Sequence, residues 1–332
     1  MNSKKKNNIV FLFLVIVLPI IALFHLFSGE IAIPFSDFYS AFMDFDSENT
    51  NQIIVKEFRF PRLIMGVIAG GGLSVAGLLM QTLFNNPLAG PDVLGISSGS
   101  SLFVAFTLMS GIPFFNSDFG TIISALIGAF AFGLVILAFS MVVKSHISLL
   151  LIGIMLGSFT GAFVSIVQTL SNPEDLKMFI MWAMGSLQHV ESSQLPIIIA
   201  FFIIGIISCF FVVKSLNALV LGENQAFMLG VKVKYIRIIL IAITAVLTGL
   251  ITAFCGPIAF VGLAVPNLVK LLFKTQSHRI LLIGCLLIGS IFLLVCDIFV
   301  QLLESSIHIP INALTSIIGA PFVILIVLKR LA

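Results

Sequence analysis

Residues 63–83 read Leu63-Ile-Met-Gly66-Val-Ile-Ala-Gly70-Gly-Gly-Leu-Ser-Val-Ala-Gly-Leu-Leu-Met-Gln-Thr-Leu83, a stretch that has no charged residue and is rich in glycine. About 20 apolar residues suffice to cross the ~30 Å hydrocarbon core of a membrane as an α-helix. Gly66 and Gly70 form a GxxxG pair, which lets a second helix backbone approach closely. The stretch predicts a spanning helix that is either a close-packed central element or, on one face, the lining of a path through the membrane.

Similar apolar runs recur along the whole chain of 332 residues, which is 59% hydrophobic and 9% charged and has a mean hydropathy of +1.21. Soluble domains have about 25% charged residues. The composition therefore predicts an all-α integral membrane protein, one membrane domain over residues 1–332, with about ten spans. The expected spans are Ile9–Phe27, Leu63–Leu83, Val93–Ser110, Thr121–Val143, Ile147–Leu170, Leu195–Val213, Ile236–Cys255, Ile258–Phe273, Ile280–Val300 and Ala313–Leu328.

The basic residues set the orientation, because Lys and Arg stay on the cytoplasmic side of a membrane. With both termini inside, all but four of the 17 Lys and Arg residues fall at or near the cytoplasmic face. The exceptions are Lys56, Arg59, Arg62 and Lys177. The same orientation predicts long outer loops at residues 28–60 and 171–194 and a long inner loop at residues 214–235.

Motifs for catalysis are missing from the sequence: it has no P-loop, no GxGxxG and no HExxH. The four cysteines stand singly in or beside apolar spans, and the five histidines show no spacing typical of metal ligands. We therefore expect no enzyme, no cofactor, no metal site and no nucleic-acid partner. Asp297 and Glu304 are the only candidates for buried carboxylates, which is few for an ion-coupled carrier. An uphill transporter of this kind needs energy from a partner subunit.

Four groups of residues resemble a known family, the FecCD-type permeases of bacterial ATP-driven importers for iron-siderophores, haem and cobalamin. The resemblance covers the chain from about Phe58 to the C-terminus. Its motifs are Arg59-Phe-Pro-Arg62 with Gln81-Thr-Leu-Phe-Asn-Asn-Pro-Leu-Ala-Gly-Pro91 and Leu94-Gly-Ile-Ser-Ser-Gly99, Leu219-Val-Leu-Gly-Glu-Asn-Gln-Ala-Phe-Met-Leu-Gly-Val231, Cys255-Gly-Pro-Ile-Ala-Phe-Val-Gly-Leu-Ala-Val-Pro-Asn267, and Ile309-Pro-Ile-Asn-Ala-Leu-Thr-Ser-Ile-Ile-Gly-Ala-Pro-Phe322.

The resemblance implies that Arg59 and Arg62, three residues apart at the outer face, receive acidic residues of an extracytoplasmic substrate-binding protein. Arginine suits such contacts because it can hold a carboxylate through two hydrogen bonds. The alternative is that both side chains simply reach toward the membrane interface. Gln301 stands where relatives often have a further arginine, which leaves the strength of docking open.

The inner loop resembles the coupling helix by which relatives contact the cytoplasmic ATPase. Its exposed apolar and small residues between two glycines would suit a partner groove, although an amphipathic helix on membrane lipid remains the alternative. The expected coupling residues are Leu221, Gly222, Glu223, Ala226, Phe227, Leu229 and Gly230.

The resemblance also implies a translocation path and an inner gate. Broken helices at Gly and Pro often line cavities in transporters, and the gate of relatives lies near the turn between the fourth and fifth spans. His146 and Ile147 are not the small hydroxyl residues expected in that turn. The expected path or gate residues are Ser97, Ser98, Ser145, His146, Ile147, Gly256 and Pro257.

Together these features predict the permease subunit of an ATP-binding-cassette (ABC) importer in the bacterial inner (cytoplasmic) membrane, with iron-siderophore as the expected cargo. Haem and cobalamin remain open as cargoes. Expected partners are cytoplasmic ATPase subunits, a substrate-binding protein, a second permease copy and membrane lipid. The rival classes are an ion-coupled secondary transporter and a membrane-embedded enzyme that acts on lipid.

Overall fold

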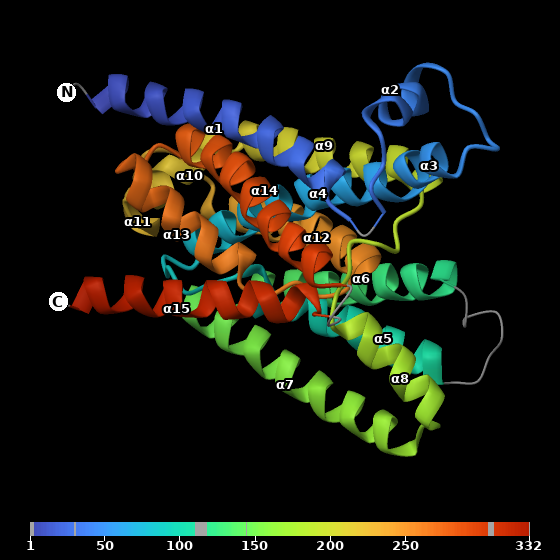
Figure 1. Cartoon of the computed structure of the whole chain (residues 1–332). Helices are drawn as coiled ribbons and strands as arrows, with labels where there is room; N and C mark the ends of the chain where they lie inside the picture. Colours follow the sequence, from blue (N-terminus) through green and yellow to red (C-terminus); the bar gives the residue numbers. More distant parts are fainter. Residues whose placement is uncertain (1–2, 30, 110–117, 144, 305–308, 332) are drawn as a thin grey trace.

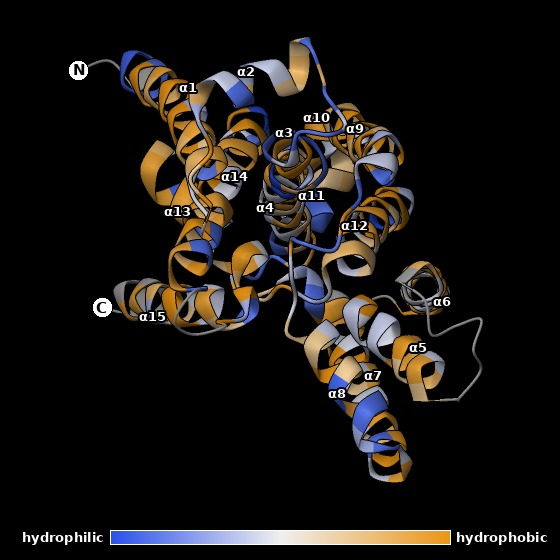
Figure 2. Cartoon of the chain, turned by 45° about the vertical axis from the view of Figure 1, so that its right-hand side comes forward, coloured by the Kyte–Doolittle hydropathy of each residue, from blue (hydrophilic) through white to orange (hydrophobic). Residues whose placement is uncertain are grey.

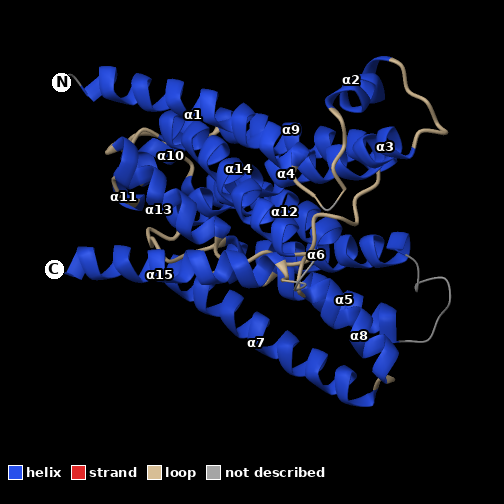
Figure 3. Cartoon of the chain, viewed as in Figure 1, coloured by secondary structure: helices blue, strands red, loops and turns tan. Residues whose placement is uncertain are grey.

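The computed structural model describes residues 3–29, 31–109, 118–143, 145–304 and 309–331. All regular structure within these ranges is helical (Figure 3). The elements are α1 (Ser3–Phe27), α2 (Phe35–Met43), α3 (Thr50–Ile53), a π-helical turn (Ile54–Arg59), α4 (Phe60–Leu83), a 3₁₀ turn (Pro91–Leu94), α5 (Ile96–Met109), α6 (Asp118–Val142), α7 (His146–Leu170), α8 (Pro173–Ala183), a 3₁₀ turn (Ser192–Gln194), α9 (Leu195–Phe211), α10 (Val213–Leu219), α11 (Glu223–Met228), α12 (Val233–Cys255), α13 (Val261–Phe273), α14 (His278–Leu303) and α15 (Ile311–Leu331).

The predicted spans correspond to helices of the structure, and the all-helical membrane fold is confirmed. Among the described residues, seven helices are long and apolar enough to cross a membrane, and α5, α13 and α15 are shorter apolar helices. The predicted start of the eighth span at Ile258 is wrong, because Phe260 adopts a left-handed backbone conformation and α13 begins only at Val261. The predicted third span also begins too early, since Gly95 at φ 70° separates the 3₁₀ turn from α5. Ser110, its predicted end, lies outside the described residues.

The functional elements gather at two opposite ends of the bundle (Figure 1). The N-terminal end of α1, the C-terminal end of α15 and the inner-loop helices α10 and α11 lie at one end, which we call the inner end. Helices α2 and α3, in the predicted outer loop, lie at the other, which we call the outer end. The predicted outer loop at residues 171–194 contains the helix α8, which includes Trp182.

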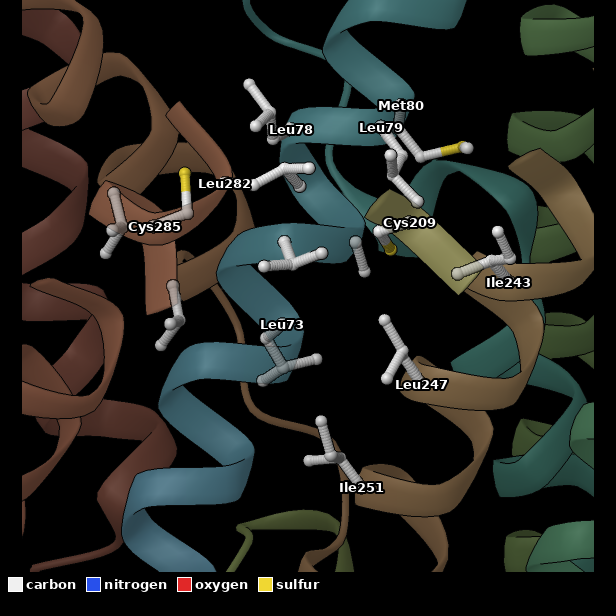
Figure 4. Packing of buried hydrophobic residues seen from close by; sticks show 14 of the residues in the cluster. Leu73, Leu78, Leu79, Met80, Cys209, Ile243, Leu247, Ile251, Leu282 and Cys285 are labelled. Atoms are coloured by element: carbon white, nitrogen blue, oxygen red, sulfur yellow. The ribbon is translucent and has the colours of Figure 1, made fainter. Parts of the chain in front are cut away.

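Helix α4 is the centre of the packing, because it is enclosed along most of its length by α12, α13 and α14. In Figure 4, α4 lies between Leu247 and Ile251 of α12 on one side and Leu282 and Cys285 of α14 on the other, and Leu78 of α4 lies on the side of Leu282. A β-carbon on Gly70 would overlap the carbonyl of Gly289 in α14, and one on Gly77 would overlap Gly262 in α13. The glycines therefore permit direct backbone contact, as the GxxxG pattern predicts.

Helices α1, α7 and α9 are largely apolar (Figure 2). In the most apolar 18-residue stretch of each helix, only 11%, 17% and 22% of the residues are buried. Apolar surfaces of this extent mark contacts with a membrane or another protein chain. This arrangement fits a multi-pass membrane protein whose polar residues lie mainly at the two ends.

The two contrasting glycines Gly77 and Gly161 test the backbone contact. Gly77→Ala places a methyl group against the backbone of Gly262, whereas nothing lies within 4 Å of a β-carbon on Gly161. We expect Gly77→Ala to lower the free energy of unfolding by about 1–3 kcal/mol or more, measured by unfolding in mixed detergent micelles. Gly161→Ala should leave the stability unchanged, and equal losses in both variants would contradict this packing.

Candidate functional site

An ionic cluster lies at the outer end where α1, α4 and α14 meet. Arg62 donates from Nε and Nη2 to the two carboxylate oxygens of Asp297, at 2.7 Å and 2.9 Å. Nε2 of His25 lies 2.7 Å from Oδ2 of Asp297, and Gln301 donates from Nε2 to the same oxygen at 3.1 Å. Glu304 adds a longer contact of 3.6 Å to Nη1 of Arg62. Asp297 is thus held by three side chains from three helices.

Arg59 lies beside this cluster and is bound by backbone carbonyls. Its guanidinium donates from Nη1 to the carbonyl of Leu26 at 2.8 Å and from Nη2 to the carbonyl of Ile31. The residue is buried, at 9% exposure, although the sequence placed it at an open outer face. Arg59 therefore ties the end of α1 and the following turn to the start of α4.

Both predicted docking arginines line one cavity of about 560 Å³ at the outer end. His25, Gln301, Glu304 and His189 line it as well. The sequence therefore placed Arg59 and Arg62 correctly on one side, but it did not show that their guanidinium groups already have partners inside the chain. Docking by these residues stays a prediction, and an incoming carboxylate has to compete with Asp297 for Arg62.

The predicted coupling segment lies at the inner end as two short helices, α10 and α11. Phe227 and Met228 are 73% and 87% exposed, and Leu221 and Leu229 are exposed too. The glycines at either end, Gly222 and Gly230, have φ values of 103° and 85°, which side chains other than glycine rarely adopt. The segment therefore presents an apolar face that is bounded by two sharp turns.

One predicted member of that face is wrong: Ala226 is fully buried and packs inward. Met228, which the sequence analysis did not single out, is the most exposed of the large apolar residues there. A helix of 3.6 residues per turn sends neighbouring side chains in different directions, so Phe227 and Met228 point outward while Ala226 points inward. Glu223 is only partly exposed, because its carboxylate accepts a hydrogen bond of 2.9 Å from Nη2 of Arg237.

The predicted path and gate residues lie at different depths. Ser97 contacts Thr252 of α12, at 3.5 Å between hydroxyl oxygens, and also donates to Oδ1 of Asp92 at 3.1 Å. Thr252 lies one turn before Gly256, whose φ is 70° where α12 ends. Ser98 lies against Gly157 of α7. Ser97 of α5 thus faces α12 and Ser98 faces α7, whereas Gly256, with Pro257 next to it, lies at the C-terminal end of α12 beside Trp182 and Gly185.

The predicted gate turn lies at the inner end of α7. Ser145 is the N-cap of α7, and its hydroxyl accepts from the backbone N–H of Ser148 at 3.4 Å. Ile147 is exposed, and the side chain of His146 lies outside the described residues. Among the described residues, no hydrogen bond joins this turn to Ser97 or Gly256, and the path and gate assignments stay predictions.

The comparisons with known proteins agree with this architecture. The sequence profile of the FecCD transport family matches residues 14–329. This chain belongs to the FecCD transport family. The resemblance drawn from the sequence is therefore confirmed, and with it the expected place in the bacterial inner membrane as a multi-pass protein.

Several curated members of the family are similar over most of their length. The hemin transport system permease protein HmuU of Yersinia pestis is 32% identical, over 99% of this chain and 98% of its own. The vitamin B12 import system permease protein BtuC of Photorhabdus laumondii is 35% identical over 84% of this chain and 83% of its own. The Fe(3+) dicitrate transport system permease protein FecD of Escherichia coli K12 is 31% identical over 96% and 98%.

Similarity in three dimensions is equally extensive. A solved ABC transporter of the metal-chelate type, in an inward-facing conformation, matches this FecCD chain with a TM-score of 0.84 and 29% identity. The match covers 96% of this chain and 99% of the other.

The ionic cluster gives a direct prediction of stability. Asp297→Asn removes the charge that neutralises Arg62 in a buried setting, and breaking a buried pair in this way costs about 3–5 kcal/mol. Glu304→Gln is the matched control, because Glu304 is 27% exposed and its contact is long, so its loss should cost only about 0–1 kcal/mol. Unfolding in mixed detergent micelles measures both, and similar losses would contradict the central role of Asp297.

Proposed function

We propose that this chain is the transmembrane permease subunit of an ABC importer that moves a metal chelate, an iron-siderophore, inward across the bacterial inner membrane. The observation that supports this most is the exposed apolar face at the inner end of a FecCD-family bundle. An apolar face of this kind on a polar loop favours a protein partner. In the proposal that partner is a cytoplasmic ATPase, and the permease itself hydrolyses nothing.

The outer cavity supports the second partner in the proposal, a substrate-binding protein that delivers the chelate. Arg59 and Arg62 line that cavity and are the cationic groups an acidic side chain would meet there. Arginine favours such contacts because its planar fork matches a carboxylate. In this proposal the incoming acid displaces part of the internal network around Asp297.

A second copy of the permease completes the proposed assembly, with residues 1–332 acting as one membrane domain. The largely exposed face of α7 supports this arrangement. Ser98 lies against Gly157 of α7, and the gate turn precedes the same helix. A path at the interface between two copies would therefore run beside residues that the sequence assigned to it.

Hemin is the second candidate cargo, since the hemin permease relative is similar over 99% of this chain. Cobalamin follows from the vitamin B12 permease relatives. An ion-coupled carrier remains the rival class and is distinguished by its energy source.

The coupling face is tested by Phe227→Ser, with Phe211→Ser as the control. Both phenylalanines are strongly exposed, but Phe211 ends α9, outside the inner loop. Losing the burial of one phenylalanine at an interface removes about 1.5–3 kcal/mol, so we expect ATPase affinity to fall about tenfold or more for Phe227→Ser alone. Co-purification from lipid nanodiscs measures the affinity. If the segment rests on lipid instead, neither variant changes it.

The same preparations identify cargo and energy source. Proteoliposomes with permease, ATPase and binding protein should take up ferric siderophore only when ATP is present on the side of the membrane where the ATPase is bound. Phe227→Ser should abolish most of this uptake. Hemin and cyanocobalamin are run in parallel. Uptake by the permease alone, driven by an ion gradient, would reject the importer proposal.

Docking is tested by the double change Arg59→Gln with Arg62→Gln. A charge-assisted hydrogen bond contributes about 1.5–3 kcal/mol, so the affinity of the binding protein for the complex should fall about tenfold or more. Asp297→Asn is the informative control, because it keeps both arginines and releases Arg62, so affinity should stay equal or rise. If Asp297→Asn weakens binding as much as the double change, damage to the fold explains the loss and the docking proposal fails.

A further inference from the structure

Arg237 joins the coupling segment to the end of the helix that precedes the gate turn. Its guanidinium donates from Nη2 to Oε1 of Glu223, the first residue of α11, at 2.9 Å. From Nη1 it donates to the carbonyl of Val143, also at 2.9 Å. Val143 follows directly on α6, and Ser145, two residues later, is the N-cap of α7. One side chain thus contacts both the coupling segment and the residue that follows α6, two positions before the gate turn begins at Ser145.

We propose that Arg237 is a positioning residue that transmits movement of the coupling segment to the gate turn through the carbonyl of Val143. The proposal rests on the proposed function, since it assumes that an ATPase moves α11. Movement of Glu223 then reaches the end of α6 through the hydrogen bonds of one guanidinium, and not only through the chain that connects α11 to α12.

The setting of Arg237 suits this role. The Arg237 side chain is 6% exposed and the Glu223 side chain is 34% exposed. The arginine therefore lies below the surface, and the carboxylate that it holds reaches the surface. The carbonyl of Val143 belongs to the C-terminal end of α6, where carbonyl groups lack helical partners and attract a cation. Only arginine has a rigid fork of donors that serves two acceptors in different directions at once.

Helices α6 and α12 move together if they move at all, because they are packed closely. A β-carbon on Gly133 of α6 would lie 3.1 Å from Cβ of Ala245, and one on Gly249 of α12 would lie 2.8 Å from Cβ of Ala129. Such contacts leave little room for sliding. Arg237 lies in the first turns of α12, closer to the inner end than these contacts. Its hydrogen bonds there connect the end of α6 to α11.

The experiment measures the gate turn directly and needs no identified cargo. Ser148→Cys places a thiol in the first turn of α7 while Ser145 stays as N-cap, and Ser148 is exposed. The native cysteines Cys209, Cys255, Cys285 and Cys296 are all buried. The rate of labelling by a membrane-impermeant maleimide is compared in the complex with its ATPase, without nucleotide and with ATP trapped by vanadate. The ratio of the two rates reports the response of the gate.

Three variants are compared in the Ser148→Cys background. Allosteric couplings are typically about 5–150-fold, so Arg237→Gln should reduce the response by about fivefold or more. Arg237→Lys keeps the charge near Glu223 but not the two-directional fork, and we expect it to bind the ATPase and still show a reduced response. Lys234→Gln is the matched control, an exposed cation one turn away, and should respond as the parent does.

A charge exchange separates transmission from simple attachment. Glu223→Lys with Arg237→Glu restores an ion pair but leaves no donor at position 237 for the carbonyl of Val143. We expect this double variant to bind the ATPase and its gate response to stay low. Full recovery of the response, or a normal response in Arg237→Gln with the ATPase bound, would overturn the inference while leaving the importer proposal intact. If the parent complex binds no ATPase, the proposed function itself fails.

Discussion

The backbone contact between α4 and α14 sets where Arg62 and Asp297 meet at the outer end. The two helices touch at Gly70 and Gly289, where no side chain separates them. Arg62 precedes Gly70 by about two helical turns, and Asp297 follows Gly289 by about the same distance. Because the helices run in opposite directions, equal offsets bring the two charges face to face. The glycines that pack the core thus also place the ion pair.

Arginine at position 237 has a comparable place at the inner end. It gathers a carboxylate from α11 and a carbonyl from the end of α6 on the first turns of α12. Each end of the bundle therefore has an arginine that holds the carboxylate of another helix. The difference lies in burial: Asp297 is 1% exposed, whereas the Glu223 side chain is 34% exposed and so reaches the surface where a partner could act on it.

Sequence patterns were sufficient for the spans, because hydropathy over about 20 residues reports directly on a membrane-crossing helix. They were less reliable at Ile258 and Ala226, where one residue decides the outcome. Apolar residues continue from Ile258 into α13, so hydropathy hides the left-handed turn at Phe260. Ala226 was assigned to an exposed face from composition, whereas its place on the helix turns it inward. Both errors come from backbone geometry, which composition does not encode.

The contacts of the candidate site were beyond sequence reasoning for a different reason. His25 and Asp297 are 272 residues apart in the chain, and only the fold brings them within hydrogen-bonding distance. A signal did exist, since a single carboxylate inside an apolar span has to find a partner. Arg62 lies at the same outer face in the expected topology, but the sequence patterns suggested only an external partner or the membrane interface for it, not Asp297.

The occupied state of Arg62 changes what docking at this surface means physically. A carboxylate arriving from outside meets a guanidinium that is already neutralised at 2.7 Å and 2.9 Å by Asp297. The gain from a new contact is then the difference between two ion pairs, not the full value of one. Asp297 would in turn keep His25 and Gln301 as partners, which lowers the cost of releasing Arg62. Because Glu304 also contacts Arg62, the network can exchange a partner of Arg62 while Asp297 stays hydrogen-bonded, and this favours reversible over permanent attachment in the proposed docking.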